Sequence, residues 1–167
     1  MSTHSSMTGY NETLFSRRPV RVETETDIAR TATEVFNFVS NAALWHTWHP
    51  ATVSVRDVPK RPLTTGEAIP ETITMGGAQR ELLWTVVACD VPTRWEIMTD
   101  SPRGTAHIVY RLSATGTGCH FHRTLDFRSK GMLRSALDWS LKRRVFVRQS
   151  TQALANLKAV IERLGVA

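Results

Sequence analysis

The first folded segment is marked by alternating polar and apolar residues over 20–28, VRVETETDI. Val20, Val22 and Ile28 fall on one side, and this period of two predicts a half-buried strand. From residue 31 the apolar spacing becomes helical. Thr31 and Glu34 stand three residues apart, which is the capping-box pattern at the start of a helix. A short helix is therefore predicted directly after the first strand.

The stretch ALWHTWHP, residues 43–50, follows this helix. Pro50 disfavours α geometry at His49, so we expect a short second helix or helical turn. Trp45 and Trp48 stand three residues apart on one face. This spacing favours a role in anchoring the short helix.

From residue 51 the pattern returns to strands, separated by short Pro- and Gly-rich segments such as Gly76-Gly77, which is typical of a hairpin turn. Short connections between successive strands predict an antiparallel meander. The expected strands cover residues 51–58, 66–75, 80–90, 94–100, 105–114 and 119–128.

Residues 130–164 are predicted to form one long helix, with Gly165 where a C-terminal cap belongs. Its first part, 130–140, could instead be a separate turn. The predicted class is α+β: a curved seven-stranded antiparallel sheet wrapped around the long C-terminal helix, with two short helices after strand 1. A curved sheet and one helix cannot fill all the space between them, so we expect a cavity lined from both sides.

The chain has 167 residues, 41% of them hydrophobic and 22% charged, which suits one globular domain. No apolar run reaches the roughly 20 residues of a membrane span. Residues 1–18 are expected to be a disordered or loosely ordered polar tail without the apolar centre of a signal peptide. Residues 19–167 are expected to form a single ligand-binding domain. A cytoplasmic location follows as the default.

The formal net charge is +6. Such a charge can serve nucleic acid or an anionic membrane surface, but no nucleic-acid motif is present. The densest basic run, Lys142 to Arg148, is expected to be the solvated face of the last helix. A membrane-surface or partner-binding module that uses this run remains an alternative. Cys89 and Cys119 are expected to be free thiols.

Two pairs of histidines suggest a metal site and are weighed against the strand pattern. His46 and His49 form a helical pair, and His120 and His122 lie two apart on a strand. Four imidazoles could bind zinc if the two segments met. However, Phe121, Leu125 and Phe127 are the better inward set on that strand, which turns both of its histidines outward. We therefore expect no metal and no cofactor.

Alternation within the strands and spacing within the last helix select the residues that face each other across the predicted cavity. A filled core would explain most of them, whereas the small residues at 150 and 153 favour a cavity. Trp139 could belong to a lid or simply pack. The predicted ligand-binding residues are Trp48, Trp84, Val86, Trp95, Ile97, Ile108, Tyr110, Trp139, Phe146, Ser150 and Ala153.

Three stretches carry a family resemblance: VETETDIARTATEVFNFVSNAALWHTWHP, GTGCHFHRTLDF and RQSTQALANLKAVIERLG. With Trp48 shortly before Pro50, and Leu157-Lys158 before Glu162, the chain resembles the START-like helix-grip (SRPBCC) superfamily. Within that superfamily, the chain resembles small bacterial proteins of the polyketide cyclase/dehydrase kind. The resemblance covers Val20 to Gly165. It implies a helix-grip fold and places Trp48 close to the cavity mouth.

The leading functional hypothesis is the binding or carriage of a hydrophobic or amphipathic small molecule, lipid- or polyketide-like, between the sheet and the last helix. We expect neither nucleic acid nor stable membrane insertion, and the sequence leaves a homodimer open. The alternative is a polyketide cyclase/dehydratase-like enzyme that uses the same cavity, with Tyr110 as the proton donor. His107, Arg80 and Glu81 are weaker candidates.

Aromatase/cyclases that the chain resembles carry an arginine and tyrosines in their cavities. The hydrophobic alternation assigns no arginine to the inward face of these strands, which counts against cyclase chemistry.

Overall fold

A computed structural model describes residues 19–130 and 136–164, with side chains in the second range from residue 140. The predicted polar tail, residues 1–18, lies outside the described residues. The order of elements is the predicted one. The elements are β1 (Val20–Ile28), α1 (Ala32–Val39), the 3-10 helix η1 (Ala42–Thr47), β2 (Thr52–Val55), β3 (Ala68–Met75), β4 (Ala78–Asp90), β5 (Arg94–Ser101), β6 (Gly104–Thr115), β7 (Gly118–Ser129) and α2 (Ala136–Arg163).

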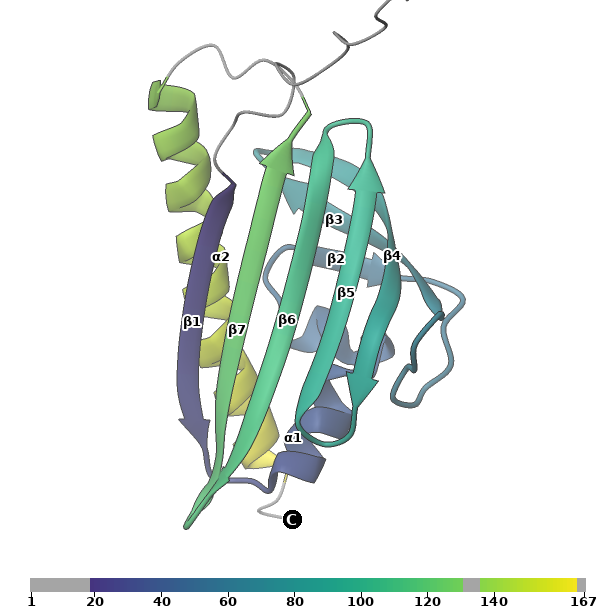
Figure 1. Ribbon diagram of the computed structural model, residues 1–167, viewed down its shortest axis with the longest axis vertical. Helices are drawn as coiled ribbons and strands as arrows, with labels where there is room; N and C mark the ends of the chain where they lie inside the picture. The colour runs from purple at the N-terminus through teal and green to yellow at the C-terminus, as the bar shows by residue number, and fades with distance from the viewer. Residues whose placement is uncertain (1–18, 131–135, 165–167) are drawn as a thin grey trace, which may run out of the picture.

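The seven strands form one antiparallel sheet in the order β1-β7-β6-β5-β4-β3-β2. The sheet curves, and the long helix α2 lies along its concave side (Figure 1). The predicted helix-grip architecture is confirmed. The β3–β4 hairpin turns at Gly76 and Gly77. Their φ angles of 60° and 77° lie in the left-handed region, which glycine adopts freely.

The first helix begins as predicted. Thr31 Oγ1 accepts from the backbone N–H of Glu34, and the Glu34 carboxylate accepts from the backbone N–H of Thr31. This reciprocal capping box satisfies two amides that the first turn of a helix leaves without partners. It fixes where β1 ends and α1 begins, and so places η1 beneath the sheet.

Two predicted boundaries are wrong. The strand expected over 51–58 ends at Val55, because Asp57 adopts a left-handed φ of 53° that breaks the extended run. The long helix does not begin at residue 130. The backbone N–H of Lys130 instead donates to the carbonyl of Arg103, at the end of the β6–β7 pair, and α2 is described over Ala136–Arg163.

The C-terminal half of α2 is tied to the rest of the fold by hydrogen bonds. Glu162 Oε1 accepts from the backbone N–H of Ala29 at 2.8 Å, and Asn156 Nδ2 donates to the carbonyl of Trp48 at 3.0 Å. The Leu157 side chain is fully buried beneath the sheet. Among the described residues, no helix combines the length and apolarity needed to cross a membrane.

Candidate functional site

A cavity of about 630 Å³ lies between the concave face of the sheet and α2. This volume is in the range of small-molecule sites. Its outer end, the mouth, is formed by the β3–β4 turn, the β5–β6 turn and the N-terminal half of α2. The lining residues there are exposed: Gly76, Gln79, Pro102, Arg103, Leu141, Lys142 and Val145.

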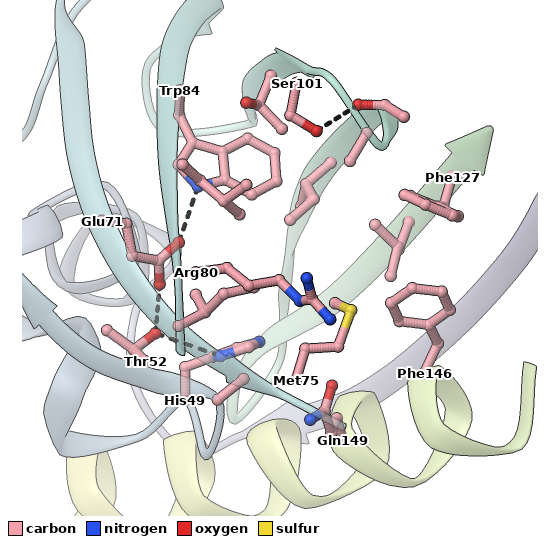
Figure 2. A pocket seen from close by; sticks show the side chains of 18 of the residues that line it. His49, Thr52, Glu71, Met75, Arg80, Trp84, Ser101, Phe127, Phe146 and Gln149 are labelled. Atoms are coloured by element: carbon pink, nitrogen blue, oxygen red, sulfur yellow. Dashed lines mark hydrogen bonds between the residues drawn. The ribbon is translucent and has the colours of Figure 1, made fainter. Parts of the chain in front are cut away.

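The walls between the mouth and the buried end are largely apolar. Phe127 of β7 and Phe146 of α2 contact each other with ring centroids 5.2 Å apart, so sheet and helix meet on this side. Figure 2 shows these rings facing Trp84 and Met75 across the cavity. The other apolar wall residues include Ile73, Leu82, Ile97, Ala106, Ile108 and Leu125.

The buried end, the floor, is polar. It consists of Trp48, His49, Thr52, Glu71, Tyr110, Arg123 and Ser150, all of which line the cavity and all of which are buried except the partly buried His49. These side chains come from η1 or the residues after it, β2, β3, β6, β7 and α2. The fold thus gathers polar groups from the whole length of the chain at one place.

Arg123 corrects the expectation that no arginine faces inward. It lies opposite Tyr110 in the β6–β7 ladder and is 2% exposed. Its Nη1 donates to Ser150 Oγ of α2 at 2.8 Å. Its Nε–H has no hydrogen-bond partner among the described residues. A buried cation with a free donor is costly unless an acceptor reaches it.

The signal for Arg123 was present in the sequence. Phe121, Leu125 and Phe127 share its strand parity, and the structure buries Phe121 and Leu125 on the concave face. Strict alternation would have placed residue 123 beside them. The prediction fails at this position because a charged side chain, taken alone, argues for the surface.

Glu71, Thr52 and His49 form a hydrogen-bonded chain that no sequence pattern had indicated. Thr52 Oγ1 donates to Glu71 Oε1 at 2.5 Å and lies 3.3 Å from His49 Nδ1. Trp84 Nε1 donates to the second carboxylate oxygen of Glu71 at 2.7 Å. Figure 2 shows this chain leading from Trp84 to the imidazole. Glu71 is thereby fixed by two donors in a buried position.

The electrostatics of the floor follow from burial and from the Arg123 charge. Burial, reinforced by Arg123, lowers the pKa of His49 to about 3, so this imidazole is neutral at physiological pH. Burial raises the pKa of the Glu71 carboxyl, and Thr52, Trp84 and Arg123 act against that rise. Burial also raises the pKa of the Tyr110 hydroxyl, with Arg123 again opposing.

Trp48 belongs to the floor and not to the mouth, where the resemblance had placed it. Its ring meets those of His49 and Tyr110 edge-on, at centroid distances of 5.6 Å and 6.5 Å. It is 1% exposed, and its Nε1–H finds no partner within the described part of the chain. Trp45 anchors η1 by donating from Nε1 to the carbonyl of Val39 at 2.9 Å.

The structure divides ten of the eleven predicted ligand-binding residues into two groups. Three lie in the packed core and do not line the cavity: Val86, Trp95 and Ala153. Trp95 stacks on Tyr110 and donates its Nε1–H to the carbonyl of Leu63, which uses its polar end. The side chain of Trp139 lies outside the described residues. The predicted residues that line the cavity are Trp48, Trp84, Ile97, Ile108, Tyr110, Phe146 and Ser150.

The remaining candidates for chemistry lie apart from the floor. His107 is on the convex face of the sheet, where it contacts Glu96 at 3.0 Å. Glu81 is exposed and pairs with Arg56. Arg80 and Glu81 both line the cavity, and Figure 2 shows Arg80 reaching across the middle. Arg80 is thus a second arginine that contradicts the expectation of no inward-facing arginine.

No metal-binding cluster of His, Cys, Asp or Glu occurs in the described ranges. His46 is exposed whereas His49 lines the cavity, and His120 pairs with Asp27 at the sheet edge. The two predicted histidine pairs therefore do not converge. Cys89 and Cys119 are free thiols, as expected. Lys142, Arg143, Arg144 and Arg148 are exposed on α2, and Lys142 also borders the mouth.

Comparison with known proteins finds a family model, polyketide cyclase / dehydrase and lipid transport, that matches residues 19–162. A START superfamily protein from Mycobacterium smegmatis superposes with a TM-score of 0.71 at 12% identity, covering 86% of this chain and 98% of that one. The di-domain ARO/CYC StfQ from the steffimycin biosynthetic pathway gives 0.69 at 16% identity, covering 90% of this chain and 53% of that one.

A protein of unknown function from Staphylococcus aureus gives a TM-score of 0.70 at 13% identity, covering 91% of this chain and 99% of that one. At these identities the structural matches support the fold alone. No curated protein sequence matches the chain significantly.

Proposed function

The chain belongs to the polyketide cyclase / dehydrase and lipid transport family, and from that premise we propose that its cavity binds an amphipathic small molecule, lipid- or polyketide-like. The apolar part of the ligand occupies the space between sheet and helix, and an oxygen-bearing end reaches the floor. The free thiols Cys89 and Cys119 suit a reducing compartment. The proposal therefore includes a cytoplasmic location. It includes no nucleic-acid partner, because the sequence carries no nucleic-acid motif.

One observation carries this proposal: an apolar cavity that ends in buried polar atoms without partners. Within the described residues, Trp48 Nε1, Thr99 Oγ1 and Arg123 Nε are buried, lack a hydrogen bond and belong to side chains that line the cavity. A buried donor left unpaired costs roughly 1–3 kcal/mol. Ligand oxygens that accept from these donors would recover that cost, and a plain hydrocarbon would not.

The test is binding of N-phenyl-1-naphthylamine, an uncharged fluorescent probe, to the wild type and two tryptophan variants. Ala106 lines the cavity and Ser113 is exposed on the same strand. Ala106→Trp should abolish binding by filling the cavity, whereas Ser113→Trp should bind like the wild type. Equal binding by both variants would overturn the proposal. Independently of this test, native mass spectrometry of freshly purified protein would identify any co-purified ligand of a few hundred daltons.

A second candidate is catalysis in the same cavity, as in a polyketide cyclase or dehydratase. It is favoured by the placement of Tyr110 beside Arg123, because a phenol can supply a proton while the guanidinium stabilises negative charge on a carbonyl oxygen. Tyr110→Phe should then abolish turnover of a polyketide-like substrate and preserve its affinity. Equal loss of affinity and turnover would leave Tyr110 as a binding residue.

A further inference from the structure

The chain from Glu71 to His49 determines which atom the imidazole presents to the cavity. Thr52 has a single hydroxyl proton, and it is donated to Glu71 Oε1 at 2.5 Å. The contact between Thr52 Oγ1 and His49 Nδ1 at 3.3 Å therefore uses a proton on Nδ1. A neutral imidazole with its proton on Nδ1 carries a lone pair on Nε2, so His49 is an acceptor on its free side.

In the hydrogen bonds described here both oxygens of Glu71 accept, as they do in an ionised carboxylate. Trp84 Nε1–H can only donate, and it occupies Oε2, while Thr52 occupies Oε1. Arg123 lies close enough to act on the Glu71 carboxyl and on His49 alike. The second ring nitrogen of His49 lies on the side of the ring away from Thr52 (Figure 2). It is the polar atom that His49 offers to the cavity it lines.

The floor thus combines the acceptor Nε2 of His49 with donors that have no partner among the described residues. The donors are Arg123 Nε–H and Trp48 Nε1–H, and the Trp48 ring contacts that of His49. A hydroxyl group matches both kinds of atom, because one oxygen can donate its proton and accept from two donors. A carboxylate could accept from Arg123, but it has no proton for Nε2 and would add a second negative charge beside Glu71. A ketone or ether has no proton for Nε2.

We propose that the floor is a hydroxyl-binding site, selective for an uncharged ligand end such as an alcohol, enol or phenol. The O–H donates to His49 Nε2, and its oxygen accepts from Arg123 and Trp48. This inference rests on the proposed function, since the rest of the ligand must occupy the cavity. Glu71 and Thr52 are positioning residues: they do not touch the ligand but hold the imidazole in the tautomer that accepts.

The isosteric variant Glu71→Gln reverses the hydrogen bonds without removing a side chain. Because Trp84 can only donate, the amide oxygen of residue 71 faces Trp84 and the amide NH₂ faces Thr52. Thr52 must then donate to His49 Nδ1, which moves the imidazole proton to Nε2. The floor of this variant lacks the imidazole acceptor and should lose its preference for a hydroxyl.

The experiment measures competition of decan-1-ol and 1-methoxydecane against bound N-phenyl-1-naphthylamine, in wild type and Glu71→Gln. The wild type should bind the alcohol about tenfold or more tightly than the ether, because the ether leaves Nε2 unpaired. The preference should disappear or invert in Glu71→Gln. Long-range ¹H–¹⁵N spectra of the imidazole should show Nε2 without a proton in the wild type and with one in the variant.

Different failures separate the two proposals. If the fluorescent probe binds but alcohol and ether compete within about twofold of each other, the hydroxyl site is overturned and the cavity stands. A preference that persists unchanged in Glu71→Gln overturns the role of the Glu71–Thr52–His49 chain. If none of the three molecules binds, the proposed function itself fails.

Discussion

The floor and the mouth of the cavity are built in opposite ways. The floor takes polar side chains from six parts of the chain, buries them and connects them by hydrogen bonds such as Arg123–Ser150 and Thr52–Glu71. The mouth consists of two hairpin turns and the N-terminal half of α2, where Leu141 is 51% and Val145 41% exposed. Fixed polar geometry selects a chemical group, whereas an exposed apolar rim selects only for size and hydrophobicity.

The two regions also differ in how firmly α2 is held. Near the floor, Ser150 and Asn156 bond to Arg123 and to the backbone of Trp48. In the wall next to the mouth, sheet and helix meet through the packing of Phe146 on Phe127. Local opening should therefore cost less free energy at the mouth than at the floor. The proposed ligand would then enter at the mouth without disturbing its recognition at the floor.

The largest effect on affinity should come from removing the positive charge of Arg123 from the floor. Arg123→Met should lower the affinity for decan-1-ol about tenfold or more, because a hydrogen bond to a charged group contributes roughly 1.5–3 kcal/mol. Competition against N-phenyl-1-naphthylamine measures this, and the affinity for that probe itself should be unchanged, which shows that the cavity is intact. An alcohol affinity equal to that of the wild type would remove Arg123 from the recognition of the ligand.

The next effect concerns acid stability. Burial lowers the pKa of His49 to about 3 from an ordinary value of 6.5. Between these values the unfolded chain binds one proton more than the folded chain, so the free energy of unfolding falls as pH falls, by up to about 1.4 kcal/mol per pH unit. His49→Asn keeps a donor for Thr52 and lacks this titration.

Chemical denaturation between pH 6.5 and 5 isolates the His49 contribution, because most carboxylates remain ionised in that window. The wild type should lose stability more steeply than His49→Asn. His120, whose pKa is raised by its bond to Asp27, is present in both proteins and cancels in the comparison. Parallel curves would mean that His49 is not held neutral by its surroundings.

A smaller loss is expected from the helix side of the floor. Ser150→Ala leaves Arg123 Nη1 without the acceptor that lies 2.8 Å away. The free energy of unfolding should fall by roughly 1–2 kcal/mol, since a buried donor loses its partner. Urea denaturation measures this, with Thr151→Ala on the exposed side of the same helix as the control. Equal stabilities for the two variants would contradict the structural role of the Arg123–Ser150 bond.

The smallest effect is expected at the mouth. Val145→Ser removes apolar area from a side chain that is already 41% exposed. It should weaken the binding of decan-1-ol and of 1-methoxydecane equally, by about threefold or less. The lost contact is worth no more than roughly one buried methylene group. A change in the preference for alcohol over ether would show that selectivity is not confined to the floor.

Regular periodicity made most of the fold predictable. The alternation in VRVETETDI, the capping pair Thr31–Glu34 and the turn at Gly76-Gly77 all depend on neighbouring residues, and the structure contains each of them. The boundaries that failed depend on single residues. Asp57 ends β2 early through its backbone conformation, and such a left-handed φ has no periodic signature.

The candidate site was predictable on its apolar side and, on the floor, at Trp48, Tyr110 and Ser150. Ile97, Ile108 and Phe146 follow from strand and helix spacing, and they line the cavity. The rest of the polar floor instead depends on contacts between residues far apart in sequence, as between Thr52 and Glu71. Arg123 was accessible to strict alternation, but its charge argued for the surface. A buried cation becomes reasonable only once Ser150 is known to face it.

The central claim is that the floor binds the polar end of a ligand. A crystal structure of the protein with decan-1-ol tests this claim most directly. We predict that the hydroxyl oxygen lies within hydrogen-bond distance of Arg123 Nε and His49 Nε2, and that the alkyl chain runs past Phe146 to the mouth. An alcohol bound with its hydroxyl at Leu141 and its chain at the floor, or bound on the convex face of the sheet, would contradict the assignment of the floor as the selective end.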